Sequence, residues 1–146
     1  MRRYIAAVLC LVGVLSAGAA GQSNAPVPIL PNSLHWVSPL TVSGLQMAWV
    51  IGSEQKPGAY ILRVKLEGGA KIPPHTHPDE RNTTVLAGVL YVGFGEIFDE
   101  TQVVAIPVGA VYVAPASVSH YIWAKDGEVM FQEAGMGPTG TVFLKR

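Results

Sequence analysis

Short runs of β-branched, aromatic and other apolar residues, separated by glycines and prolines, recur from residue 35 to residue 144. In Ala59–Leu66, apolar residues at even positions alternate with Arg63 and Lys65, a period of two that predicts a strand with one face inward. No window shows helical periodicity bounded by capping residues. The other predicted strands are 35–37, 45–51, 83–94 with a bend at Gly88, 103–106, 111–114, 120–123, 129–133 and 141–144. Strands at spacings of about 8 to 12 residues predict an all-β sandwich or barrel.

The N-terminus carries the features of an export signal. Two arginines at positions 2 and 3 precede the apolar run Tyr4–Leu15, and small residues follow at 16–20. We predict a signal peptide over residues 1–20, because the apolar run is shorter than the roughly 20 residues that a membrane span needs. A retained anchor is the alternative. Residues 21–33, with three prolines, predict an extended leader, and 34–146 the folded domain. We expect an exported protein, periplasmic or extracellular, with no stable membrane insertion after cleavage.

Charge and cysteine content exclude several classes of protein. The chain has ten basic and ten acidic residues, and cleavage would remove Arg2 and Arg3, so the mature net charge would be near −2. No basic patch indicates a nucleic-acid partner. The only cysteine, Cys10, would leave with the signal peptide, so the mature domain would have neither a disulfide nor a thiol nucleophile. No glycine-rich phosphate loop is present.

The segment His75-Thr76-His77 carries the strongest chemical signal. Two histidines at positions i and i+2 of an extended segment point to the same face. Neutral imidazole is the commonest protein ligand for first-row divalent metals. Pro73, Pro74 and Pro78 stiffen the flanks, which suits a preorganised site, although prolines also mark ordinary loops.

The wider pattern resembles the two motifs of the cupin superfamily. Gly69, five residues, His75-Thr76-His77 and the closing Gly88 match the first motif. Gly109, five residues, Pro115 and then His120 match the second. The resemblance implies a single antiparallel β-barrel of the double-stranded β-helix or jelly-roll type. It also implies that His75, His77 and His120 bind a divalent transition metal, with Fe, Mn, Ni, Cu and Zn all compatible with such ligands.

The sequence departs from the first motif at its glutamate, which would be the fourth ligand. Arg81 occupies that position, and Glu80 lies one residue earlier. In one interpretation, a one-residue bulge near Asn82 turns Glu80 toward the metal. In the other, Arg81 faces inward, the metal keeps three histidines plus water, and the guanidinium is offered to an anionic substrate or carboxylate. A third alternative is that Glu80 and Arg81 form an exposed pair at the start of a strand, which contributes little. The second motif also departs, with Ser117 in place of a glycine and Ala124 in place of an asparagine.

The fold leaves several functions open, because cupins host many unrelated chemistries. We predict that Arg81, Trp49, Tyr91 and Trp123 contact a small-molecule ligand; other candidate inward residues are Tyr60, Leu62, Val113 and Phe131. The first hypothesis is a metal-dependent oxygenase or isomerase. The alternatives are a non-catalytic binding or sensing barrel, and a scaffold that has lost its metal. The resemblance is also compatible with a homodimer, in which the chains pair through an edge strand or through the N-terminal leader.

Overall fold

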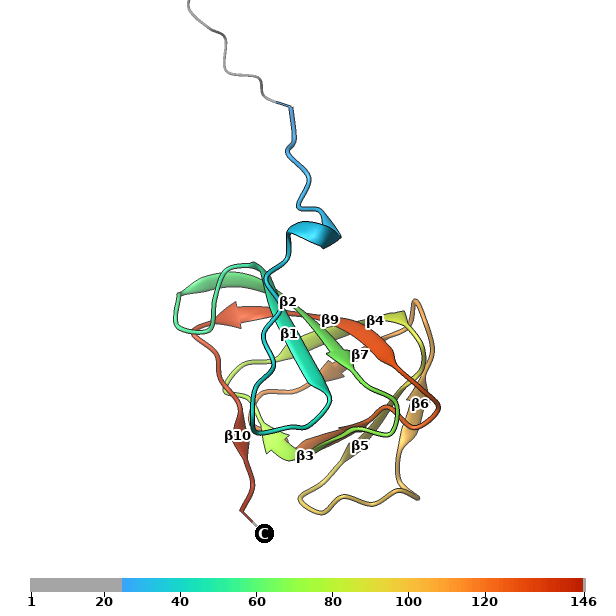
Figure 1. Cartoon of the computed structure of the whole chain (residues 1–146). Helices are drawn as coiled ribbons and strands as arrows, with labels where there is room; N and C mark the ends of the chain where they lie inside the picture. Colours follow the sequence, from blue (N-terminus) through green and yellow to red (C-terminus); the bar gives the residue numbers. More distant parts are fainter. Residues whose placement is uncertain (1–24, 146) are drawn as a thin grey trace, which may run out of the picture.

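A computed structural model describes residues 25–145, which form a sandwich of two antiparallel sheets (Figure 1). The predicted signal peptide at residues 1–20 lies outside the described residues. One sheet has the order β1 (Leu45–Ile51), β2 (Gly58–Leu66), β9 (Val129–Gly137), β4 (Arg81–Ala87), β7 (Val111–Ala114). The other has the order β10 (Val142–Phe143), β3 (Lys71–Thr76), β8 (His120–Trp123), β5 (Leu90–Phe94), β6 (Val104–Ile106). The prediction of an all-β jelly-roll fold is confirmed.

The core lies between the two sheets, where the inward residues of facing strands meet. Strand β2 follows the predicted alternation, with Leu62, Val64 and Leu66 buried and Arg63 and Lys65 only partly covered. It pairs along its whole length with β9, which directs its buried residues into the same core. Burying each large aliphatic side chain contributes roughly 1.5 to 3 kcal/mol, and this sum, not a disulfide, holds the sheets together.

The predicted run 83–94 proves to be two strands in different sheets. Strand β4 ends at Ala87 and β5 begins at Leu90, and Gly88 turns the chain between them. Gly88 has φ +74°, and a Cβ there would collide with the carbonyl oxygen of Glu128. The bend expected at Gly88 is therefore a sharp corner that only glycine allows without strain.

Strand β3 was not among the predicted strands, because prolines at 73 and 74 indicated a loop. The prolines lie at an irregularity in the pairing of β3 with β8, between Ile72 and His75. Proline is tolerated in a sheet at such positions, where the ladder does not need its missing N–H. The histidine pair therefore begins on a strand of the second sheet, with His75 directly opposite His120.

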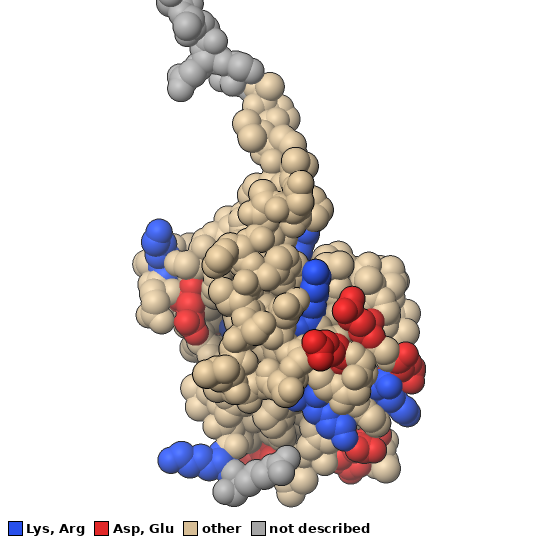
Figure 2. Space-filling model, viewed as in Figure 1, with Lys and Arg blue, Asp and Glu red and all other residues tan. Residues whose placement is uncertain are grey.

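The described part of the leader, residues 25–33, runs away from the sandwich, as Figure 1 shows. It contains one short 3-10 helix, η1 (Pro31–Ser33), and Val37 then forms an isolated bridge with Met47 of β1. Within residues 25–145, no helix has the length and apolar character needed to cross a membrane. On the face shown in Figure 2, basic and acidic side chains are interspersed among large uncharged areas.

Candidate metal centre

His75, His77 and His120 come together inside the sandwich. His75 is on β3, His77 follows the end of that strand, and His120 begins the neighbouring β8. All three are buried, with relative exposures of 3%, 3% and 1%. Each offers one nitrogen to a group whose ligand atoms all lie within 4.8 Å of one another. The histidines of the first and second motifs are thus brought together by the pairing of β3 with β8.

Each of these histidines is oriented by a backbone carbonyl. The Nδ1 atoms lie 2.8 Å from the oxygen of Pro73 for His75, 2.8 Å from that of Gly140 for His77, and 3.1 Å from that of Val118 for His120. A carbonyl only accepts, so Nδ1 carries the proton and donates it, which leaves the lone pair on Nε2. The Nε2 atoms of His77 and His120 are buried without a hydrogen-bond partner.

Burial keeps the three rings neutral. Desolvation, with a smaller repulsion from His120, lowers the pKa of His75 to about 3. Desolvation and the nearby Arg81 guanidinium lower the pKa of His77 to about 3. Burial also lowers the pKa of His120. A metal binds the neutral imidazole, so these rings need not lose a proton at neutral pH before they act as ligands.

The donor set therefore fits a divalent transition metal. A buried ring nitrogen without a hydrogen-bond partner lowers the stability of the fold. A metal ion would accept the lone pairs of these nitrogens and remove that cost. The carbonyls that accept from Nδ1 are the kind of supporting contact that fixes ring orientation in metal sites. Imidazole suits iron, manganese, nickel, copper and zinc, so the ligands do not select one metal.

Arg81, not Glu80, faces the interior. Along β4, residues 81, 83 and 85 are buried, and Glu80, just before the strand, is exposed. The bulge near Asn82 that would turn Glu80 inward is absent: β4 pairs without a shift with β7 and, from Asn82 to Val85, with β9. Glu80 lies outside the group of candidate ligands found among the described residues. The geometry thus follows the second interpretation of the altered motif.

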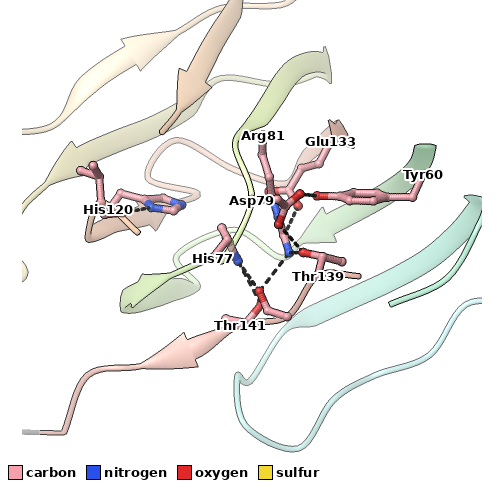
Figure 3. A network of polar contacts seen from close by, with 10 residues as sticks. Tyr60, His77, Asp79, Arg81, His120, Glu133, Thr139 and Thr141 are labelled. Carbon is pink, nitrogen blue, oxygen red and sulfur yellow. Dashed lines mark hydrogen bonds and ion pairs between the residues drawn. The ribbon is translucent and has the colours of Figure 1, made fainter. Parts of the chain in front are cut away.

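Arg81 is the centre of a buried polar network, drawn in Figure 3. Its Nη1 donates to Glu133 Oε2 at 2.6 Å, and its Nη2 donates to Thr139 Oγ1 at 2.9 Å and to the Gly140 carbonyl at 3.2 Å. Asp79 accepts from Tyr60 at 2.6 Å and from Thr139 at 2.5 Å. Burial and the Asp79 hydrogen bond raise the pKa of Tyr60, so its hydroxyl stays protonated. Because Gly140 also accepts from His77, one carbonyl connects this network to the histidines.

A small cavity, about 60 Å³ in volume, opens beside His75, His77 and Arg81. Its remaining lining residues are Leu45, Met47, Leu62, Val64, Ile72, Ile122, Phe131, Glu133 and Thr141. The lining therefore combines aliphatic and aromatic side chains with imidazole, guanidinium and carboxylate groups. Of the four predicted ligand contacts, Arg81 alone lines this cavity.

Trp49, Tyr91 and Trp123 lie elsewhere. Trp123 alternates with His120 and Ile122 along β8 and so points to the opposite face of the sheet, where it packs against Tyr91 at 6.4 Å between ring centroids. Lys71 and Lys125 cover the Trp123 ring at 4.5 and 5.4 Å from its centroid. Trp49 packs edge-on against Tyr60. The strand register thus turns Tyr91 and Trp123 away from the cavity. Trp49 lies on the same face of β1 as Leu45 and Met47 but is not among the residues that line the cavity.

Glu133 and Asp79 were not predicted as site residues. The signal for Glu133 was available, because it is two residues beyond Phe131 on one strand and must share its inward face. A charged residue in phase with a core aromatic indicates a buried partner, here Arg81. Asp79 had no such signal, because it lies in the turn before β4, where no periodicity applies.

Comparison with known proteins agrees with this architecture. No model of a protein family matches the sequence. Germin-like protein 5-1 from Oryza sativa subsp. japonica is 37% identical over 68 residues, or 44% of this chain. The chain spans only 30% of that curated relative.

Solved structures extend the match to most of the chain. KdgF from Halomonas sp. aligns with a TM-score of 0.60 at 20% identity, over 74% of this chain and 92% of its own. The polyketide cyclase RemF from Streptomyces resistomycificus aligns with a TM-score of 0.65 at 15% identity, over 84% and 89%. These proteins and the germin-like relative all share one fold. The chain has the cupin fold. An oxalate oxidase, a salicylate 1,2-dioxygenase and DMSP lyases also match this cupin barrel, so the fold does not select a reaction.

Proposed function

We propose that this cupin binds a divalent transition metal through His75, His77 and His120 and acts as a metal-dependent oxygenase or isomerase on a small molecule. One observation carries the proposal: three buried imidazoles, each with Nδ1 held by a carbonyl, bring one ring nitrogen apiece to within 4.8 Å of one another. That many structural relatives are enzymes of small-molecule chemistry supports the catalytic interpretation, without selecting a substrate.

The chemistry would come from both the metal and the chain. When bound, a transition metal supplies Lewis acidity and, for iron, manganese or copper, redox chemistry. The three histidines would hold the metal, and the apolar side chains of Leu45, Met47 and Phe131 line the cavity beside them. Arg81, fixed by Glu133 and Thr139, orients a substrate by charge and hydrogen bonding.

A non-catalytic binding or sensing barrel is the second candidate function. The observation in its favour is that the carboxylates near the cavity are already engaged. Glu133 accepts from Arg81, and Asp79 accepts from Tyr60 and Thr139. Neither has the freedom that a general acid or base usually needs. This candidate predicts stoichiometric metal and ligand binding without turnover.

Export and self-association are further parts of the proposal. Cleavage after Ala19 or Ala20 would appear as a new N-terminus on protein recovered from the periplasm or medium. Exposed apolar side chains on the edge strand β7, Val111 and Val113, support a homodimer. A molar mass of one chain, measured by light scattering, would contradict the homodimer and leave the proposed export untouched.

Metal content of the protein purified after export tests the function directly. Elemental mass spectrometry should find about one transition metal per chain, lost in His75→Ala and His120→Ala. Glu80→Gln is the matched control, since Glu80 is exposed and lies outside the ligand group. Turnover of small molecules with oxygen consumption, or isomerisation without it, then separates the two enzyme classes. A full metal complement with no turnover of any class would favour the binding barrel.

A further inference from the structure

The buried groups around the cavity carry a surplus of negative charge. Arg81 is paired with Glu133 at 2.6 Å and with Asp79 at 3.8 Å, so one guanidinium faces two carboxylates. The three side chains are only 5%, 6% and 10% exposed, which leaves little solvent to screen them. With the histidines neutral, as metal ligands must be, this cluster has a net charge near −1.

A bound divalent ion would reverse that balance to about +1. An unpaired charge in a desolvated site is costly, and the cost disappears when a group of opposite sign enters. One monoanion would bring the loaded site to neutrality. A neutral molecule would leave it positive, and a dianion would make it negative again.

Arg81 has donors left for such an anion. Its hydrogen bonds to Glu133, Thr139 and Gly140 involve only Nη1 and Nη2. Its Nε is buried without a hydrogen-bond partner: it lies 3.8 Å from Asp79 Oδ1, too far for a hydrogen bond, and the residue lines the cavity. Guanidinium donors match a carboxylate in geometry and charge, so a carboxylate is the anion that this side chain suits best.

The cavity also limits the size and character of the ligand. A volume of about 60 Å³ holds only about four water-sized groups at roughly 15 Å³ each. The cavity is also lined by apolar residues, which include Leu45 and Met47. A ligand with a charged head and a short hydrocarbon body would suit both kinds of lining residue.

We propose that the metal-loaded site binds a short-chain monocarboxylate, with the carboxylate on Arg81 and the hydrocarbon against Leu45 and Met47. This proposal rests on the proposed metal centre and names the substrate class for it. Binding requires the metal, because without it the anion would join a cluster that is already negative. Metal and carboxylate therefore strengthen each other's binding.

Calorimetric titration of the zinc-loaded protein, purified as the exported chain, tests the proposal without any need for turnover. Zinc content is measured on the same sample. Acetate should bind once per chain, at least tenfold tighter than acetamide, its neutral counterpart of similar shape, and tighter than malonate. The metal-free protein should bind acetate at least tenfold more weakly than the loaded protein.

Two substitutions separate charge from shape. Glu133→Gln keeps an oxygen to accept from Arg81 but removes one negative charge, and should tighten acetate binding by about tenfold at equal zinc content. Arg81→Lys keeps the charge but loses the planar fork, and should weaken acetate binding by a similar factor. Glu80→Gln, an exposed carboxylate one residue from Arg81, should change nothing.

The outcomes distinguish this inference from the function on which it rests. A protein that binds one zinc per chain but takes acetamide as tightly as acetate, or in which Glu133→Gln weakens acetate binding, overturns the inference and leaves the metal centre intact. A protein that binds no zinc overturns both.

Discussion

The three site histidines share one local device, a carbonyl that takes the Nδ1 proton. For His75 and His120 the carbonyl is two residues earlier in the chain, at Pro73 on β3 and at Val118 just before β8. For His77 it comes from Gly140, far along the chain. The local contacts orient two rings as soon as their strands form, whereas His77 depends on the closing segment near Thr139. That segment also contacts Arg81, so ligand geometry and Arg81 position are coupled.

The lowered histidine pKa values predict an acid-sensitive metal-free protein. His75 and His77 have folded-state pKa values of about 3 against the usual 6.5, so the unfolded chain binds more protons between these limits. The free energy of unfolding then has its highest value above about pH 6.5. It falls as pH drops toward 3, by up to about 1.4 kcal/mol per histidine per pH unit. Thermal melts of chelator-treated protein at pH 7 and pH 5 measure this.

A matched pair of variants isolates the cause. His75→Asn should reduce the loss of stability between pH 7 and pH 5, since His77 still contributes, whereas His35→Asn, at an exposed histidine, should leave that loss unchanged. An equal Tm at both values of pH in the metal-free parent would contradict the neutral, buried state of these rings.

Ser117 stands where the cupin motif has glycine, and its backbone keeps the glycine conformation. Its φ is +62°, and its N–H donates to the His77 carbonyl at 2.8 Å. A left-handed conformation costs a non-glycine residue roughly 1 to 2 kcal/mol, partly offset by the greater flexibility of unfolded glycine. Ser117→Gly should therefore raise the unfolding free energy by about 0.5 to 1 kcal/mol, measurable by urea denaturation. Ser119→Gly, which removes a hydrogen bond to the Gly95 carbonyl, should lower it.

At the level of elements, the pairing of β4 with β9 builds the polar wall of the cavity. Thr83 lies directly opposite Glu133, and Arg81, two residues before Thr83, shares its inward face. Tyr60, on the other side of β9, reaches Asp79 past Gly135, its partner in the β2–β9 ladder. The network thus depends on the lack of a side chain at Gly135.

Substitution of Gly135 tests that dependence. A Cβ at this position would collide with the Tyr60 ring and the Asp79 carboxylate, so Gly135→Ala should break their hydrogen bond and lower the unfolding free energy by about 1 to 3 kcal/mol. Gly140→Ala is the control, because a Cβ there meets nothing closer than Glu54 at 3.8 Å. Equal stability of the two variants in denaturant titrations would contradict the packing described for Gly135.

Strands with clean alternation, such as Gly58–Leu66, could be predicted from the sequence because period two is a local property. Strand Lys71–Thr76 could not, because its prolines are allowed only by a pairing irregularity that depends on β8. The corner at Gly88 needed knowledge of which sheet each half joins. The motif spacing predicted the three clustered histidines, whereas the choice between Glu80 and Arg81 depended on the strand register, which the sequence left open.

On the scale of the whole molecule, a bound metal would link the segments that carry the two motifs, because its ligands come from both. The ligands come from β3, the turn after it and β8, and Gly140 holds His77 from beyond β9. A ligand that binds only the folded state stabilises it by RT ln(1 + [L]/Kd), about 4 kcal/mol at a thousand times Kd. Zinc should therefore raise the Tm by several degrees, with reversal by chelator, as differential scanning calorimetry can show. His120→Ala should abolish the increase, whereas Glu80→Gln should retain it.

The most direct test of the central claim is anomalous X-ray diffraction from crystals of the zinc-loaded protein. The structure predicts one strong anomalous peak per chain at about 2.0 to 2.1 Å from Nε2 of His75, His77 and His120, with no carboxylate of Glu80 in contact. A peak coordinated by Glu80, a peak away from these histidines, or no peak from a chain that has taken up zinc would contradict the three-histidine centre.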